Sequence, residues 1–308
     1  MSTSSLAIPR GGLALLLRDY AELVKLRVTS LILMAAGAGY YFGALRQHGS
    51  APLSWTLFHA LLGIGFVSGG TAALNEVLEA DIDGRMRRTA NRPLVTGRMS
   101  LTHGLAVGLL MVVGGSEYLA FTTNLTTALL TAGTSAVYLG IYTPLKKKHP
   151  LCTFVGAFPG AMPPVLGWTA TRGRLDWEAL ALFAILFFWQ FPHFHSIAWL
   201  YREDYERAGI RMLPVVEPDG RSTSRSVLLY LTALIPATVA PIFIGMSGWL
   251  YGAAAVLLGL AFFWTGARLA RIKLPATAAQ SKRYARQVLQ ASVLYLPLLF
   301  ALMMLDAK

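Results

Sequence analysis

The stretch WTLFHALLGIGFVSGGTAALNEVLEADIDGRMRRTANRPL, from Trp55 to Leu94, decides the fold class of this 308-residue chain. Its first half, Trp55 to Leu74, contains one histidine and no formal charge, and is long enough to cross a bilayer as a helix. Polar side chains begin where that helix would leave the membrane. The stretch therefore predicts a transmembrane helix with a polar cluster at one rim.

The polar cluster repeats every four residues, as Asn75, Glu79 and Asp83. On a helix this spacing places successive side chains near one face, with a drift of about 40° per step. Ionisable groups at membrane depth are costly and usually functional. One amide and two carboxylates offer the oxygen ligands that Mg²⁺ prefers, so the spacing predicts a magnesium site. The candidates for holding an anion beside the metal are the arginines that follow: Arg85, Arg87, Arg88, Arg92 and Arg98.

The composition excludes a water-soluble domain. Hydrophobic residues make up 55% of the chain, charged residues 14%, and the mean hydropathy is +0.53. Cys152 is the only cysteine, which excludes disulfides within the chain and a cysteine-based metal site. We expect an all-α membrane protein, with a disordered N-terminal tail over residues 1–12 and a single polytopic domain over residues 13–308.

Apolar runs of about 18 residues or more predict a bundle of about nine transmembrane helices. The runs lie near residues 28–45, 54–76, 102–121, 124–143, 152–170, 177–200, 226–246, 249–268 and 288–305. In the fifth run, Pro159, Pro163 and Pro164 predict a kinked or broken helix that lines a cavity.

The basic residues are distributed unevenly between the two ends of these helices. Of the 27 lysines and arginines, 23 fall in the N-terminal tail and the loops after the second, fourth, sixth and eighth helices. Cytoplasmic loops carry such an excess. We therefore place the N-terminus and the loops that carry the polar residues in the cytoplasm and the C-terminus outside. The net charge of +12 is thus a topology signal and requires no nucleic-acid partner.

A second polar cluster lies in FFWQFPHFHSIAWLYREDYERAGIRMLPVV, residues 187–216. It places Gln190, His193 and His195 in the sixth helix, and Glu203 and Asp204 just beyond it. For each histidine, a packing role with a bond to a carbonyl stays open beside three others: a general base, a haem contact and a polar anchor for a substrate.

Lys146 and Lys147 stand in a run of three lysines where the fourth helix emerges. Such a run either flanks the membrane on the cytoplasmic side or neutralises a diphosphate. Both interpretations stay open.

These residues resemble the motifs of UbiA-type intramembrane prenyltransferases. Asn75, Glu79 and Asp83 stand where that family has Asn-x3-Asp-x3-Asp. Arg88-Thr89-x-x-Arg92-Pro93-Leu94 matches the continuation of that motif. Segments similar to the haem-farnesylating branch of the family, the protoheme IX farnesyltransferases or haem O synthases, are Trp189-Gln190-x-Pro192-His193-Phe194 and Arg202-Glu203-Asp204-Tyr205. The likeness runs from about Tyr20 to the last predicted helix.

The chain departs from the family pattern at Leu26, where proline is usual, at Cys152, where asparagine is common, and at two places that concern metal ligands. Glu79 stands where aspartate is usual, which lengthens the ligand arm by one carbon and keeps its charge. The second loop has Tyr201 and Tyr205 where quinone-type relatives have Asp-x3-Asp, which favours the haem branch and leaves Glu203 and Asp204 as candidates for a second metal site.

The resemblance implies transfer of the farnesyl group of farnesyl diphosphate to a vinyl group of haem B, with addition of water, to give haem O. It implies Mg²⁺ as cofactor, haem B as a substrate rather than a redox cofactor, a lipid bilayer as environment, and haem A synthase as a candidate partner downstream.

The resemblance also implies roles for named residues. The catalytic set is Asn75, Glu79, Asp83, His193 and Asp204. The metal ligands are Asn75, Glu79, Asp83, Glu203 and Asp204. The diphosphate ligands are Arg27, Arg88, Arg92, Lys146 and Lys147. Additional candidates are Asp81, Gln190, His195 and Tyr205.

Three other functions stay open. A haem-binding transporter predicts polar groups near the middle of the membrane, whereas these carboxylates cluster at one rim. A haem-binding chaperone without catalysis needs His193 or His195 but not the Asn75 set. Within the enzymes, the alternative is an aromatic-acceptor, 4-hydroxybenzoate-like polyprenyltransferase of quinone biosynthesis.

Overall fold

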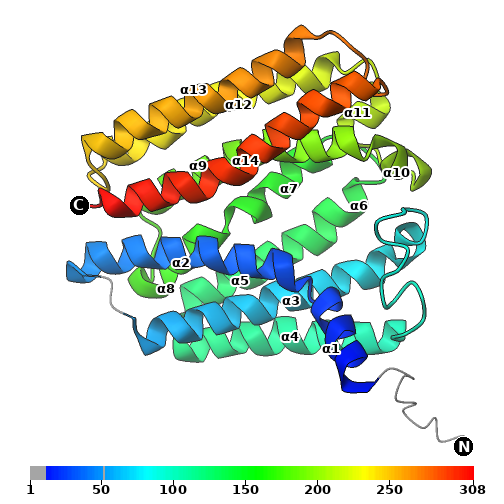
Figure 1. The fold of residues 1–308 in the computed structure, drawn as a ribbon. Helices are drawn as coiled ribbons and strands as arrows, with labels where there is room; N and C mark the ends of the chain where they lie inside the picture. The colour runs from blue at the N-terminus through cyan, green and yellow to red at the C-terminus, as the bar shows by residue number, and fades with distance from the viewer. Residues whose placement is uncertain (1–11, 51–52) are drawn as a thin grey trace, which may run out of the picture.

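The computed structural model describes residues 12–50 and 53–308 of the chain, which are helical apart from turns, loops and one isolated bridge (Figure 1). The expectation of an all-α fold is confirmed. Residues 1–11 of the predicted tail lie outside the described residues, and Gly12 is already the first residue of α1 (Gly12–Leu23).

Eight of the described helices are long and apolar enough to cross a membrane, which makes the chain an integral, multi-pass membrane protein. They are α2 (Leu26–His48), α3 (Trp55–Asp83), α4 (Leu101–Thr122), the continuous run of α5 (Leu125–Val137), η1 (Tyr138–Tyr142) and α6 (Thr143–Leu145), then α9 (Trp177–Leu200), α12 (Arg221–Phe243), α13 (Trp249–Arg271) and α14 (Ala279–Leu305). Short helices α10 (Arg202–Arg207) and α11 (Leu213–Val216) follow α9.

The fifth predicted helix is divided in two. It consists of α7 (Cys152–Ala161) and α8 (Pro163–Arg172), which meet at Met162. Pro163 and Pro164 lack the N–H groups that would continue the hydrogen bonding of α7, so they begin a new helix instead. The predicted break is confirmed, whereas the count of nine transmembrane helices is not.

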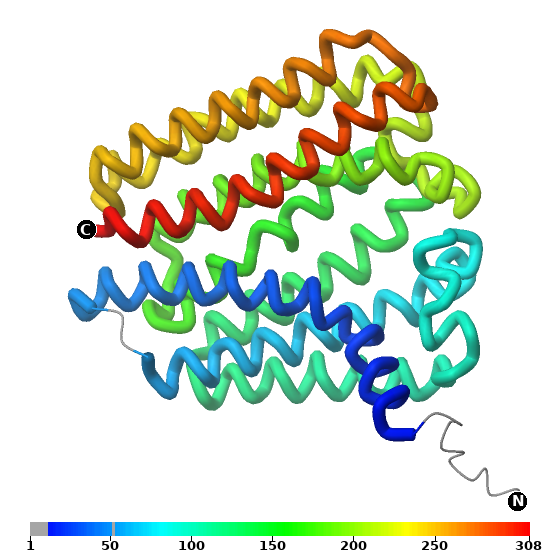
Figure 2. The backbone as a smooth tube through the Cα atoms, viewed as in Figure 1, coloured from blue at the N-terminus to red at the C-terminus, as the bar shows by residue number. Residues whose placement is uncertain are grey.

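The loops that carry the two polar clusters lie at the same end of the bundle. Figures 1 and 2 show the segment after α3, the segment with α10 and α11, and the α13–α14 loop at the right, and the C-terminus at the left. We call the end with these loops the basic end, because most of the lysines and arginines of the predicted loops belong to it.

The backbones of α2 and α8 approach each other at two glycines. A Cβ atom added at Gly39 would lie 1.8 Å from the carbonyl oxygen of Pro164, and one at Gly167 would lie 1.8 Å from that of Ala36. Small residues allow such close packing of transmembrane helices, where lipid supplies no hydrophobic drive for association. The second half of the divided helix is therefore fixed against α2.

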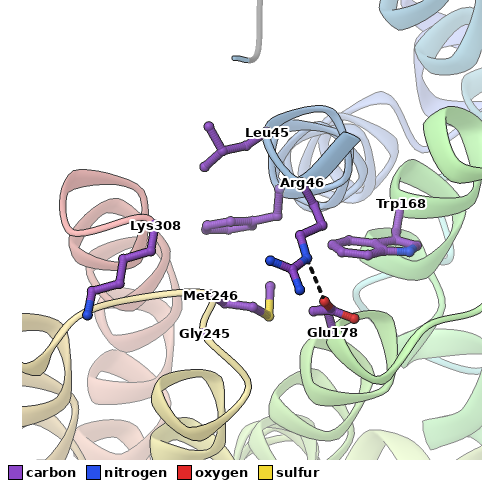
Figure 3. Close-up of a pocket in the computed structure, with 8 residues that line it drawn as sticks. Leu45, Arg46, Trp168, Glu178, Gly245, Met246 and Lys308 are labelled. Atoms are coloured by element: carbon purple, nitrogen blue, oxygen red, sulfur yellow. Dashed lines mark ion pairs between the residues drawn. The ribbon is translucent and has the colours of Figure 1, made fainter. Parts of the chain in front are cut away.

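At the end opposite the basic end, an ion pair joins α2 to α9. Figure 3 shows Arg46 of α2 pointing toward Glu178 of α9, with Trp168 beside them, and Arg46 Nε lies 3.2 Å from Glu178 Oε1. The cavity that these residues line has a volume of about 10 Å³, which is room for no more than a water molecule.

Candidate functional site

A group of buried polar side chains lines the last turns of α3. Asn75, Glu76, Glu79 and Asp83 are each at most 5% exposed, although they lie on a membrane-spanning helix. Buried charges of this kind need partners. The partners come from three different segments of the chain, and together they form what we call the α3 site.

The partner of Asn75 is Lys25, at the junction of α1 and α2. Lys25 Nζ donates to Asn75 Oδ1 at 2.9 Å, and Asn75 Nδ2 donates to Thr143 Oγ1 at 3.2 Å. Lys25 has a left-handed backbone, with φ of 47°, which turns the chain from α1 into α2. Burial and the nearby Arg92 guanidinium lower the pKa of Lys25 to about 8.

The partner of Glu79 is Lys146. The ammonium lies 2.8 Å from Oε1 and 3.0 Å from Oε2 of the carboxylate, and 4.7 Å from the centre of the Tyr142 ring. Burial opposes the charge of Lys146, but Tyr142, Tyr138 and Glu79 outweigh it, so its pKa lies above the ordinary value. The preceding π-helical turn η1 presents both tyrosines here, and such turns are frequent at functional sites.

Arg92 serves two carboxylates. It forms an ion pair with Asp83, and its Nε lies 3.5 Å from Glu76 Oε1. Thr89 donates to the backbone carbonyl of Asp83 at 2.7 Å and so fixes the turn that returns Arg92 to α3. Both carboxylate oxygens of Glu76 are buried and accept no hydrogen bond within the part of the chain that the structure describes.

The donor set fits a hard cation. Carboxylate and amide oxygens are the ligands that Mg²⁺ takes, and Glu76 has two buried oxygens that accept no hydrogen bond. Among residues 12–50 and 53–308, no three His, Cys, Asp or Glu side chains converge as a ready metal centre, because Glu79 and Asp83 are each engaged by a cation of the protein. Metal binding at these residues therefore requires that Lys146 and Arg92 turn to another anion.

Arg88 joins the two polar loops. Its Nη2 donates to the Tyr205 hydroxyl at 3.0 Å, and its guanidinium carbon lies 5.1 Å from the Tyr205 ring centre and 5.8 Å from that of Tyr201. Such cation–π contacts hold a loop in place through neutral rings, so the arginine keeps its positive charge for another partner. Arg88 and Tyr205, both predicted as site residues, are thus brought together.

The carboxylates of the second loop pair with cations outside the α3 site. Glu203 Oε1 lies 2.8 Å from Lys282 Nζ of α14, and Asp204 forms an ion pair with Arg207. Neither carboxylate contacts Glu79 in the described residues. The predicted second metal site stays a prediction.

The predicted residues of α9 each tie that helix to a neighbour. His193 Nδ1 lies 2.8 Å from Ser292 Oγ of α14, and His195 Nε2 lies 2.8 Å from Ser226 Oγ of α12. Gln190 donates to a backbone carbonyl of α7 at 2.8 Å. None of the three contacts the α3 site in the described part of the chain.

Three predicted residues lie on the surface. Lys147 and Asp81 pair with each other at 3.4 Å, both largely exposed, and Arg27 is exposed without an ion pair among the described residues. The sequence reasoning missed Lys25 and Glu76. Glu76 carried a signal, because it follows Asn75 directly inside an apolar helix.

Comparison with known proteins identifies the family of the chain. The chain matches the UbiA prenyltransferase family over residues 31–301. It is 63% identical to the protoheme IX farnesyltransferase of Koribacter versatilis (strain Ellin345), over 99% of this chain and 98% of that protein. It is 48% identical to the protoheme IX farnesyltransferase of Solibacter usitatus (strain Ellin6076), over 94% of this chain and 99% of that protein.

Solved structures share the fold at low sequence identity. A structure of digeranylgeranylglyceryl phosphate synthase in membranes has a TM-score of 0.76 at 14% identity, covering 94% of this chain and 98% of its own. A UbiA homolog from Archaeoglobus fulgidus bound to GPP and Mg²⁺ has a TM-score of 0.66 at 16% identity, covering 92% and 99%. With the family match and the full-length relatives, it follows that this chain belongs to the UbiA prenyltransferase family.

Proposed function

We propose that the chain transfers the farnesyl group of farnesyl diphosphate to a vinyl group of haem B, with addition of water, and so forms haem O. One observation carries the proposal: at one rim of the bundle, Arg92 and Lys146 are held against buried carboxylates and Lys25 is held against the buried amide of Asn75. The choice of acceptor is supported by the 63% identical relative, a protoheme IX farnesyltransferase.

The α3 site suits an allylic diphosphate because its charges are balanced and exchangeable. Its cations are Lys25, Arg92 and Lys146; its carboxylates are Glu76, Glu79 and Asp83. An allylic carbon–oxygen bond ionises once the negative charge that develops on the leaving group is neutralised. Phosphate oxygens compete with the carboxylates for Arg92 and Lys146, and this exchange frees Glu79 and Asp83.

The freed side chains are the proposed metal ligands. Asn75, Glu79 and Asp83, with the neighbouring Glu76, would hold Mg²⁺, which when bound supplies further neutralisation of the diphosphate. Arg88 holds the second loop over the first and would narrow the access of water to the site. The allylic cation is thereby protected until the acceptor attacks it.

The acceptor is proposed to lie deeper, beside α9 and α14. His193 and Trp189 stack there, with ring centres 4.9 Å apart, and present an aromatic surface suited to a flat porphyrin. We assign to His193 a contact with the porphyrin or with the water that is added after prenyl attack. The excess of basic residues at the rim supports a cytoplasmic orientation of the α3 site in a bacterial inner membrane, with the product available to an enzyme such as haem A synthase.

Turnover with defined substrates tests the proposal. Purified protein in lipid is supplied with farnesyl diphosphate, haem B and Mg²⁺. The porphyrins are then separated, and their masses are measured by mass spectrometry. We expect a haem that has gained one farnesyl group and one hydroxyl group, and none after chelation of the metal. Prenylation of 4-hydroxybenzoate with unchanged haem supports the quinone-type alternative; haem binding without turnover supports the chaperone or transporter.

A further inference from the structure

A pocket separate from the α3 site lies at the basic end, between the start of α12 and the end of α13. Its volume is about 320 Å³, at the lower end of the range of small-molecule sites. Both helix ends lie at the upper right in Figure 1, above α10, whereas α3 ends in the lower half. The lining residues that matter here are Arg221, Arg225, Lys273, Leu228, Leu269 and Leu274.

The pocket has an excess of positive charge. Three of its lining residues are cations, and one, Asp219, is an anion. Asp219 lies 3.6 Å from Arg221 Nε, whereas Arg225 and Lys273 have no ion-pair partner in residues 12–50 and 53–308. The excess therefore attracts an anion from outside the protein.

Backbone contacts hold the walls of the pocket in place. The N–H of Ala276 donates to the carbonyl of Pro218 at 2.9 Å, which joins the α13–α14 loop to the segment before α12. Gly220 has φ of 77° and lies against Trp199, where a Cβ atom would come within 2.3 Å of the ring.

Lys273 has a strained backbone. Apart from Lys25 in the α3 site, it is the one described residue other than glycine with a positive φ, at 47°. Residues held in this conformation need support from their surroundings and cluster at ligand sites. Here the conformation follows directly on the end of α13, where Lys273 lines the pocket.

The pocket is also partly apolar. Leu228, Leu269 and Leu274 line it beside the cations, and α12 and α13 continue from it into the membrane. A free inorganic anion gains nothing from leucine side chains, whereas an amphiphile uses both surfaces. Basic pockets between transmembrane helices bind anionic lipid headgroups in this way.

We propose that this pocket binds the phosphate group of an anionic phospholipid of the phosphatidylglycerol type, with its acyl chains along Leu228 and Leu269. Arg225 and Lys273 contact the phosphate, and Arg221 screens it from bulk solvent. The bound lipid fixes the α12–α13 hairpin at the membrane surface. The proposal is independent of the transferred prenyl group.

Lipid retention tests the proposal. The purified protein is exchanged into mixed phosphatidylglycerol and phosphatidylcholine, and retained lipids are counted by native mass spectrometry. Arg225→Gln with Lys273→Gln is expected to lower retained phosphatidylglycerol about tenfold and to leave phosphatidylcholine unchanged. The matched control, Arg283→Gln with Arg286→Gln, removes the same charge from exposed positions of α14 outside the pocket and retains wild-type binding.

A third variant, Arg225→Lys with Lys273→Arg, keeps the charge and is expected to retain the lipid. Unchanged retention in the pocket variant overturns the proposal, and so does an equal loss in the control, because the rim as a whole would then attract the lipid. Displacement of phosphatidylglycerol by glycerol 1-phosphate or inorganic phosphate at equal concentration assigns the pocket to free phosphate and also overturns it. Melting temperatures of all variants separate lost binding from lost folding.

Discussion

Lys146 Nζ lies 2.8 Å from Oε1 and 3.0 Å from Oε2 of Glu79, although 67 residues separate them in the chain. Both side chains are buried. The pair joins α3 to the end of the fourth span at the point where the proposed diphosphate would bind. A buried pair of this kind is expensive to break on one side only.

Removal of one partner of this pair should destabilise the protein strongly. We expect Glu79→Gln and Lys146→Met each to cost roughly 3–5 kcal/mol, because each leaves one buried charge without compensation. The double variant should cost less than the sum of the two. Unfolding in mild detergent measures the cycle, and additive losses would show that the two groups do not interact.

Lys25→Met should weaken binding of farnesyl diphosphate more than Arg27→Met does. Lys25 reaches Asn75 at 2.9 Å, whereas Arg27 is exposed. Loss of one preorganised cation is expected to lower kcat/KM about 100-fold. Steady-state rates with farnesyl diphosphate as the varied substrate check this. A larger effect of Arg27→Met would contradict it and would support Arg27, the residue predicted from the sequence, as the diphosphate ligand.

Asp83→Asn should abolish turnover while the protein still inserts and folds. Asparagine keeps the shape of the side chain and an acceptor for Arg92 but removes the charge that helps to hold Mg²⁺. Activity and melting temperature are measured at saturating Mg²⁺, and undiminished activity contradicts the metal assignment. Glu79→Asp restores the usual family residue and should be tolerated.

His193→Ala should suppress haem O formation and leave the affinity for farnesyl diphosphate within a few-fold of wild type. The contacts of His193 are with α9 and α14 rather than with the α3 site. A purely structural histidine predicts a lower melting temperature with near-normal activity in the folded fraction. Diphosphate affinity, melting temperature and haem O yield, measured on one preparation, distinguish the two roles.

A reporter fused after Lys308 should be active only outside the cytoplasm. The 23 basic residues on one predicted side predict that this side faces the cytoplasm, and the C-terminus lies at the opposite end of the bundle (Figure 1). A reporter after Arg98 serves as the cytoplasmic control. Equal activity of both fusions would contradict the proposed topology.

The part of the α3 site that lies on α3 itself could be predicted from the sequence, because helical geometry alone determines it. Asn75, Glu79 and Asp83 are buried on one continuous helix, as their spacing predicts. The role of Lys25 could not be predicted from the sequence. Lys25 lies 50 residues from Asn75 in the chain and reaches it because of the left-handed turn between α1 and α2. No local pattern reports such a tertiary contact.

The run of three lysines illustrates the same limit. Its composition does not reveal which ammonium points inward, because the π-helical turn η1 changes the register just before it. In the structure Lys146 is buried against Glu79 and Lys147 is exposed beside Asp81. The division of the fifth helix was predictable from its prolines, but its close packing on α2 at Gly39 was not.

The contacts of Gly39 and Gly167 with the facing backbones hold α2 and α8 together at one fixed point. At this contact, α2 and α8 touch through backbone atoms, which leaves no side chain between them. At the basic end, segments are joined by ion pairs and by Arg88 on its tyrosines, and these bonds can be exchanged one at a time. We therefore expect the helices to separate at the basic end, and not at the glycine contact, when a wide, rigid acceptor binds.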